Sequence, residues 1–251
     1  DTSDIILKLE KALSQVSRYN QPLNVYNDEL EIERIKYYDT LVSVYHSLKN
    51  DGFNLVFQPK LRICDNEVIG VEALLRTKNE NYEGMSILQL ITIAEDVGFL
   101  HEITKWVVLN TIKQIREWKD NGFEMNVSIN LSPIDLNDCS IIDYTMNLLE
   151  EYNVEPEMLE FEITERSAIE DKERVFDSLN EIKKHGIKVA LDDYGSGHNS
   201  LVYLGNSTFP YNNIKIDKMF IDNITEIHNK SLIKGIIESA HSLGIEVVAE
   251  G

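Results

Sequence analysis

From residue 53 onward, the chain alternates between short apolar runs and longer segments with helical periodicity. Seven runs have the length and composition of strands, at residues 54–58, 68–76, 126–132, 159–165, 188–193, 213–217 and 245–250. Segments with helical spacing lie between or after them, at about 86–97, 101–120, 140–152, 170–185, 198–204 and 228–243. A short turn at Cys64–Glu67 separates the first two strands and predicts an antiparallel hairpin. The later connections can hold a helix, so the later strands are expected to pair in parallel.

This order predicts an α/β fold, specifically a modified (β/α)8 TIM-like barrel with an antiparallel first strand and one strand short. A short helical extension precedes it, with helices at residues 3–19 and about 28–49. A doubly wound open sheet is the alternative arrangement of the same elements. No Gly-x-Gly-x-x-Gly motif follows the first strand, which weakens the dinucleotide-binding form of that alternative.

Several of the strands carry polar residues on one face. In residues 159–164, Leu, Phe and Ile alternate with Glu160, Glu162 and Thr164. In a barrel the apolar face packs against the helices, and the polar residues near the strand ends converge at one mouth, where barrel enzymes keep their active sites. The alternative is that each strand exposes its polar face to solvent, but parallel strands are normally covered on both faces. The residues expected to converge are Gln58, Glu72, Arg76, Asn130, Glu162, Asp192, Asp193, Lys215 and Glu250.

The expected mouth is rich in carboxylates, and carboxylates in one cavity need cations to neutralise them. The candidate ligands are all oxygen donors, which favour Mg²⁺ or Mn²⁺ over Zn²⁺. Adjacent Asp192 and Asp193 suit two ions, the arrangement used in phosphate-ester hydrolysis. Lys215 is expected to orient the attacking water or offset charge, and Arg76 to bind a phosphate oxygen.

The composition limits the partners. A net charge of −19 repels an extended nucleic acid. The two cysteines form neither a disulfide framework nor a zinc motif, and no apolar stretch approaches the length of a membrane span. A cytoplasmic setting is therefore expected, and a membrane anchor outside this chain stays possible.

Seven sequence blocks carry a resemblance to a known family. The blocks are Phe57-Gln58-Pro59-Lys60, Val71-Glu72-Ala73-Leu74-Leu75-Arg76, Ser128-Ile129-Asn130-Leu131-Ser132-Pro133, Glu162-Ile163-Thr164-Glu165, Leu191-Asp192-Asp193-Tyr194-Gly195-Ser196-Gly197, Lys215-Ile216-Asp217 and Val248-Ala249-Glu250-Gly251. In this order and near this spacing, across about residues 52–251, they resemble the EAL-domain family of cyclic di-GMP phosphodiesterases. The resemblance implies a hydrolase that opens cyclic di-GMP to linear pGpG in bacterial second-messenger signalling.

The resemblance also implies roles by position. Metal ligands are expected at Glu72, Asn130, Glu162 and Asp192, with Asp193 and Glu250 at a second metal or its water, and two Mg²⁺ or Mn²⁺ ions per site. Lys215 matches a lysine that contacts the catalytic water, so the catalytic set is Glu72, Asp193, Lys215 and Glu250. Substrate contacts are expected from Gln58, Leu74, Arg76 and Pro133, and Glu165 matches a residue that steadies the loop after Asp193.

The ends of the chain carry three further expectations. Residues 1–27 weakly resemble the closing helix and strand of a GGDEF-type domain, although a plain helical linker is the alternative, and residues 28–51 are expected to form a connecting helix. The barrel at residues 52–251 is expected to stop before the family's eighth strand.

The resemblance also implies partners, namely a homodimer through the loop after Asp193 and an upstream GGDEF or sensor domain. A cyclic di-GMP receptor without catalysis is the alternative function, and a degenerate scaffold that binds no nucleotide is a third.

Overall fold

The computed structural model describes residues 38, 41–42, 44–50, 52–78, 86–96, 98–137, 140–164, 172–195 and 211–251. The chain divides into two compact units, one of residues 1–52 and 79–97, the other of residues 53–78 and 98–251. In the first unit, residues 44–49 are helical and α3 spans Ile87–Asp96. The proposed GGDEF-like remnant at 1–27, the expected helix at 198–204 and Glu165 lie outside the described residues. Within the described part, no helix has both the length and the apolarity needed to cross a membrane.

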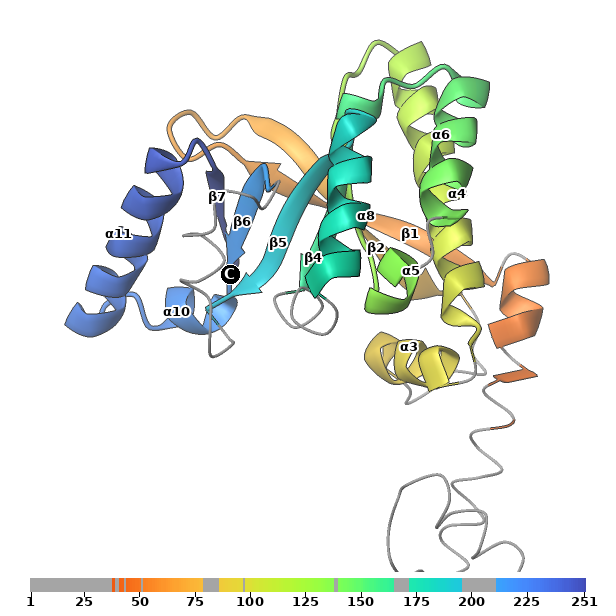
Figure 1. Ribbon diagram of the computed structural model, residues 1–251, viewed down its shortest axis with the longest axis horizontal. Helices are drawn as coiled ribbons and strands as arrows, with labels where there is room; N and C mark the ends of the chain where they lie inside the picture. The colour runs from red at the N-terminus through yellow and green to blue at the C-terminus, as the bar shows by residue number, and fades with distance from the viewer. Residues whose placement is uncertain are drawn as a thin grey trace, which may run out of the picture. The chain divides into compact units, whose positions relative to one another are not determined.

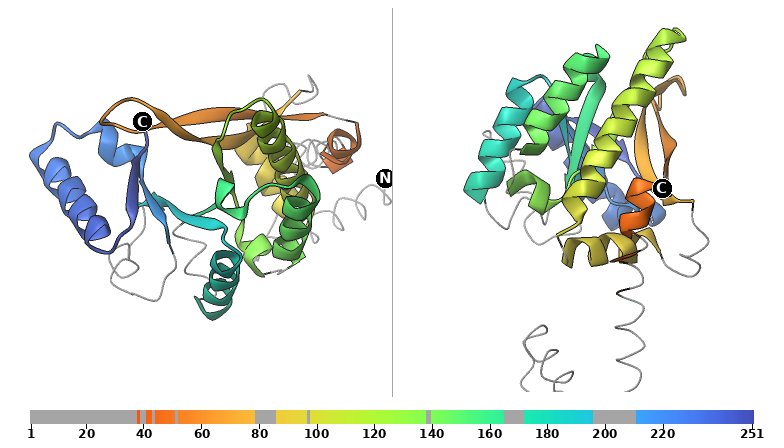
Figure 2. Two further views of the ribbon diagram at one scale, coloured as in Figure 1. Left: turned by 90° about the horizontal axis from the view of Figure 1, so that it is seen from above. Right: turned by 90° about the vertical axis from the view of Figure 1, so that its right-hand side faces the viewer.

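The second unit contains a seven-stranded sheet in which the strands follow their sequence order. β1 and β2 form an antiparallel pair, and every later neighbouring pair is parallel, so the predicted hairpin and parallel crossovers are both confirmed. The sheet curls, with β1 and β2 along one edge and β6 and β7 at the other (Figures 1 and 2). The strands are β1 (Phe53–Leu61), β2 (Val68–Thr77), β3 (Asn126–Asn130), β4 (Leu159–Thr164), β5 (Lys188–Tyr194), β6 (Asn213–Ile216) and β7 (Glu246–Ala249).

Helices cover the outer face of this sheet. Helix α4 packs on α6 and contacts β1 and β3, α8 lies on β5, and α11 lies beside β7 (Figure 1). The long helices agree with their predicted ranges to within two residues. They are α4 (Leu100–Asp120), α6 (Ser140–Tyr152), α8 (Lys172–Lys184) and α11 (Ile227–Ser242).

Three short elements were not predicted, because segments of three to five residues are too short for a hydrophobic period to appear. They are α5 (Pro133–Asn137), η2 (Pro156–Met158) and α10 (Lys218–Asp222). The start of α10 has a local cause, since the side chain of Asp217 accepts a hydrogen bond from the backbone N–H of Met219 at 2.7 Å.

The outward face of the strands forms the core with these helices. Leu159, Phe161 and Ile163 of β4 are each 0% exposed, and burying such a side chain contributes about 1.5–3 kcal/mol. On β1, the ring of Phe57 packs edge-on against Trp118 of α4, with 4.9 Å between ring centroids. This packing sends alternate residues of β1, Gln58 and Lys60 among them, to the inner face of the sheet.

Candidate metal centre

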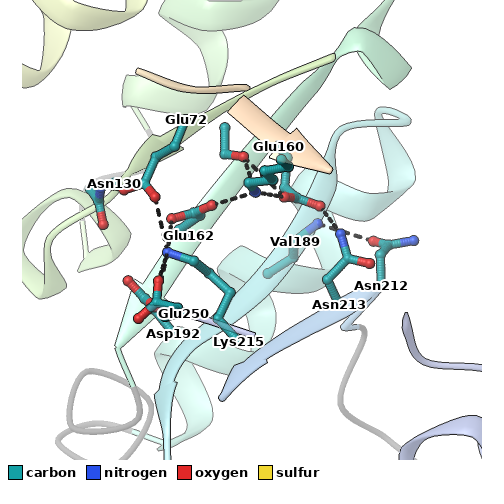
Figure 3. Close-up of polar contacts among 12 residues, drawn as sticks. Glu72, Asn130, Glu160, Glu162, Val189, Asp192, Asn212, Asn213, Lys215 and Glu250 are labelled. Atoms are coloured by element: carbon teal, nitrogen blue, oxygen red, sulfur yellow. Dashed lines mark hydrogen bonds and ion pairs between the residues drawn. The ribbon is translucent and has the colours of Figure 1, made fainter. Parts of the chain in front are cut away.

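Lys215, on β6, lies at the centre of the inner polar cluster. It is 2% exposed, and its neighbours come from β2, β4, β5 and the residue just after β7 (Figure 3). Its Nζ lies 3.2 Å from Glu72 Oε2, 2.7 Å from Glu162 Oε2, 3.0 Å from Asp192 Oδ1 and 2.8 Å from Glu250 Oε1. The strand ends therefore bring four of the sequence-predicted carboxylates to one point, as the alternation of faces predicted.

Asn130 joins this cluster from the end of β3. Its Nδ2 donates to Glu72 Oε1 at 2.8 Å, so the two oxygens of Glu72 are divided between Asn130 and Lys215. The sheet register also places Asn130 directly beside Glu162 of the next strand. A side chain that both donates and accepts hydrogen bonds is suited to hold a carboxylate ligand and to offer its own oxygen to a cation.

Consecutive aspartates face the same cluster because the end of β5 is irregular. Asp193 has φ 54°, and the β5–β6 register shifts between Leu191 and Tyr194. The backbone N–H of Asp193 donates to Asp192 Oδ1 at 2.9 Å. Asp192, Asp193 and Glu250 each place a carboxylate oxygen within 4.8 Å of the other two. This set of oxygen donors fits Mg²⁺ or Mn²⁺.

A second lysine, Lys60 of β1, lies on the inner face farther from the mouth than Gln58, and no role was predicted for it. Lys60 Nζ lies 2.7 Å from Glu162 Oε1 and 3.0 Å from Glu160 Oε1, and it also donates to Ser128 Oγ. Glu160 in turn accepts a hydrogen bond from the side-chain amide of Asn213. The available signal was the two-residue period, since Lys60 shares a face with Gln58 and Glu160 shares one with Glu162.

The two lysines and the carboxylates change one another's pKa values. Burial raises the pKa of the Glu162 carboxyl, but the charges of Lys215 and Lys60 outweigh burial and lower it overall. Burial alone would lower the pKa of Lys215, whereas the charges of Glu162, Asp192 and Glu72 raise it well above its usual value. Glu162 is therefore ionised and held between two ammonium groups.

The pKa values of three other carboxylates in the cluster shift upward instead. Burial, followed by the charge of Glu162, raises the pKa of Glu72, and Lys215 offsets only part of this rise. Burial and the neighbouring aspartates also raise the pKa of Asp193, and burial does the same for Glu250 despite its contact with Lys215. Carboxylates also outnumber the lysines in this cluster, which is the condition that favours a divalent cation.

The predicted substrate-contacting residues lie on β1, β2 and α5. Gln58 is exposed and is paired with Glu72 across the β1–β2 hairpin. Leu74 follows Glu72 by one period on β2, and Arg76 is exposed and donates to the backbone oxygen of Leu75 at 2.8 Å. Pro133 begins α5 and is half-buried. Their contacts with a substrate stay predictions.

Comparisons with known proteins point to one family. A family model described as "EAL domain" matches residues 42–251. The signaling protein YkoW of Bacillus subtilis is 35% identical over 210 residues, covering 82% of this chain and 26% of that protein. The cyclic di-GMP phosphodiesterase PdeR of Escherichia coli is 30% identical over 228 residues, covering 90% of this chain and 34% of that protein.

The fold is also found among solved structures. A structure titled "PaMucR Phosphodiesterase, c-di-GMP complex" matches with a TM-score of 0.78 and 29% identity, covering 84% of this chain and 86% of that one. The chain spans about a quarter to a third of the length of the curated relatives above.

Proposed function

Since this chain belongs to the EAL-domain family, we propose that it is a phosphodiesterase that hydrolyses cyclic di-GMP to linear pGpG with the help of divalent metal ions. The observation that carries the proposal is the convergence of Glu72, Glu162, Asp192 and Glu250 from four places in the sheet onto Lys215. The PaMucR phosphodiesterase, whose structure has cyclic di-GMP bound, shares this fold.

The proposed ligands of Mg²⁺ or Mn²⁺ are the oxygen donors of the cluster. When bound, two such ions would supply Lewis acidity and a lowered pKa for the attacking water. We assign them to Glu72, Asn130, Glu162, Asp192, Asp193 and Glu250.

The chain's own residues would position the attacking water and bind the substrate. Lys215 donates hydrogen bonds to the carboxylates and, in the proposed reaction, holds the attacking water in line with the phosphorus. The guanidinium of Arg76 would bind a non-bridging phosphate oxygen, and Gln58 would contact the substrate from the opposite strand. The curled sheet fixes these groups before substrate arrives, so little reorganisation is needed during the reaction.

The first test is hydrolysis of cyclic di-GMP by the whole chain with Mg²⁺ or Mn²⁺, followed by chromatography of pGpG. The Glu72→Gln variant should lose more than about 100-fold in kcat/KM, because substitutions beyond the direct ligands already cost about 10–100-fold. Glu67→Gln is the matched control, since Glu67 precedes the same strand and pairs with Arg62 at the surface.

Two results would refute the proposal. One is the absence of pGpG with Glu72→Gln indistinguishable from wild type. The other is tight binding of cyclic di-GMP without turnover, which would identify the chain as a receptor instead.

A further inference from the structure

The side-chain contacts of the inward-facing residues form two layers, and Lys60 belongs to the lower one. In the upper layer, Lys215 contacts Glu72 and Glu162, and Asn130 donates to Glu72. In the lower layer, Lys60 contacts Ser128 and Glu160, which precede Asn130 and Glu162 by one period on their strands. Because β1 is antiparallel to the other strands, Lys60 follows Gln58 in sequence but lies farther from the mouth.

All the hydrogen-bonding capacity of Lys60 is used inside the sheet. An ammonium group has three donors, and Lys60 directs them at Ser128 Oγ, Glu160 Oε1 and Glu162 Oε1. Its side chain is only 14% exposed. A buried ammonium with three polar partners is held in one orientation, and so are the groups that it binds.

Glu162 is consequently bound on both oxygens by different lysines. Lys60 binds Oε1 at 2.7 Å and Lys215 binds Oε2 at 2.7 Å, and the side chain of Glu162 is 0% exposed. The contact between Lys60 and Oε1 prevents the Glu162 carboxylate from rotating, so only Oε2 is directed toward the mouth. Glu160 is anchored separately, because its Oε2 accepts from Asn213.

We propose that Lys60 is a positioning residue for the metal centre: it holds Glu162 through Oε1, so that Oε2 alone is presented to a divalent cation. This inference rests on the proposed metal-dependent function. The competing explanation is that Lys60 serves only to neutralise Glu160.

The test separates these two explanations by measuring metal affinity apart from catalysis. Binding of Mn²⁺ alone and of Mg²⁺ alone is measured by calorimetry on the whole chain, and turnover of cyclic di-GMP is measured in parallel. Lys60→Met should weaken cation binding by about 10-fold or more, the usual effect of losing a partner that orients a ligand. It should also lower kcat.

The double variant Lys60→Met with Glu160→Leu removes the lysine together with the charge that it would otherwise leave unpaired, which protects the fold. If Lys60 positions Glu162, the double variant binds cations as weakly as the single one. Lys119→Met is the control, since Lys119 pairs with Glu155 at 2.6 Å on the outside of the barrel. It should leave cation binding unchanged.

Unchanged or tighter cation binding in a folded Lys60→Met variant overturns the inference, and so does wild-type affinity in the double variant. Circular dichroism and the Tm establish folding in each case. If wild type binds Mn²⁺ but releases no pGpG, the proposed function fails while the weaker binding of Lys60→Met still supports the inference.

Discussion

A buried aspartate outside the carboxylate cluster is expected to control the stability of the barrel. Asp135 of α5 is 1% exposed, and its Oδ2 accepts from Thr104 Oγ1 at 2.8 Å and from Ser132 Oγ at 2.6 Å and its N–H at 3.3 Å. Its Oδ1 lies 3.0 Å from His101 Nδ1. Asp135 therefore links the start of α4 to Ser132 in the loop after β3. Ser132 lies two residues beyond Asn130.

The cost of Asp135→Ala follows from these contacts. Hydrogen bonds to a charged acceptor contribute about 1.5–3 kcal/mol each, and they do not add fully. Thr104 also donates to Leu100 O at 3.2 Å, so its hydroxyl keeps an acceptor, whereas the N–H of Ser132 loses its side-chain partner. We expect a loss of about 3–4 kcal/mol in the free energy of unfolding. For a domain of this size that lowers the Tm by roughly 6–15 °C.

Urea unfolding followed by tryptophan fluorescence measures this loss, because Trp106 and Trp118 both lie on α4. Asp135→Asn keeps one carbonyl oxygen in place and should lose about half as much. Asp120→Ala is the control on the same helix, since Asp120 is exposed and pairs with Arg116 at the surface, and it should leave the midpoint unchanged. A loss below about 1 kcal/mol for Asp135→Ala would refute the reasoning.

Three further perturbations have defined outcomes in the same unfolding assay. Gly195→Ala should destabilise the chain by about 2 kcal/mol or more, because Gly195 has φ +102° and an added Cβ would lie 2.5 Å from the ring of Phe220; Gly235→Ala in α11, where the added Cβ meets nothing, should instead stabilise it by about 0.5–1 kcal/mol. Burial lowers the pKa of Lys60, but Glu162 and Glu160 raise it more, so its folded-state pKa exceeds the unfolded value of 10.5. Its stabilising contribution is then complete below pH 10.5 and is lost as pH rises through the folded-state pKa, so the stability gap between wild type and Lys60→Met should shrink only above that pH. A destabilised Gly235→Ala, or a gap that closes near neutral pH, would contradict these expectations.

Alternation of faces was enough to predict most of the cluster from the sequence. Glu72 and Glu162 interrupt apolar runs at the period of a strand, and only one face of a covered parallel strand can hold such residues without exposing the apolar ones. The rule that parallel barrel strands end at one mouth then predicted that Lys215 and Glu250 lie at the same point. The observed distances to Lys215 confirm this convergence.

The geometry of Asp193 could not be predicted from alternation. Neighbouring residues of a regular strand face opposite sides, so Asp192 and Asp193 should have pointed apart. They share the cluster because Asp193 adopts φ 54° where the β5–β6 register shifts. A positive φ is uncommon outside glycine but is more accessible to aspartate and asparagine. That Asp193 adopts it is seen only in the structure, where β5 pairs with β6.

Lys60 was missed because the rule of the common mouth does not apply to an antiparallel strand. On β1, Gln58 pairs with Glu72 and comes before Lys60, which pairs with Gly70, so the end of this strand lies farther from the mouth than its start. A balance of the buried charges in each layer would have predicted Lys60. Glu160 is a second buried carboxylate one period below Glu162, and a buried carboxylate without a cation is strongly unfavourable. Lys215 is already shared among four carboxylates above, so the lower layer needs a cation of its own, and Lys60 is the lysine that the inner face of β1 supplies.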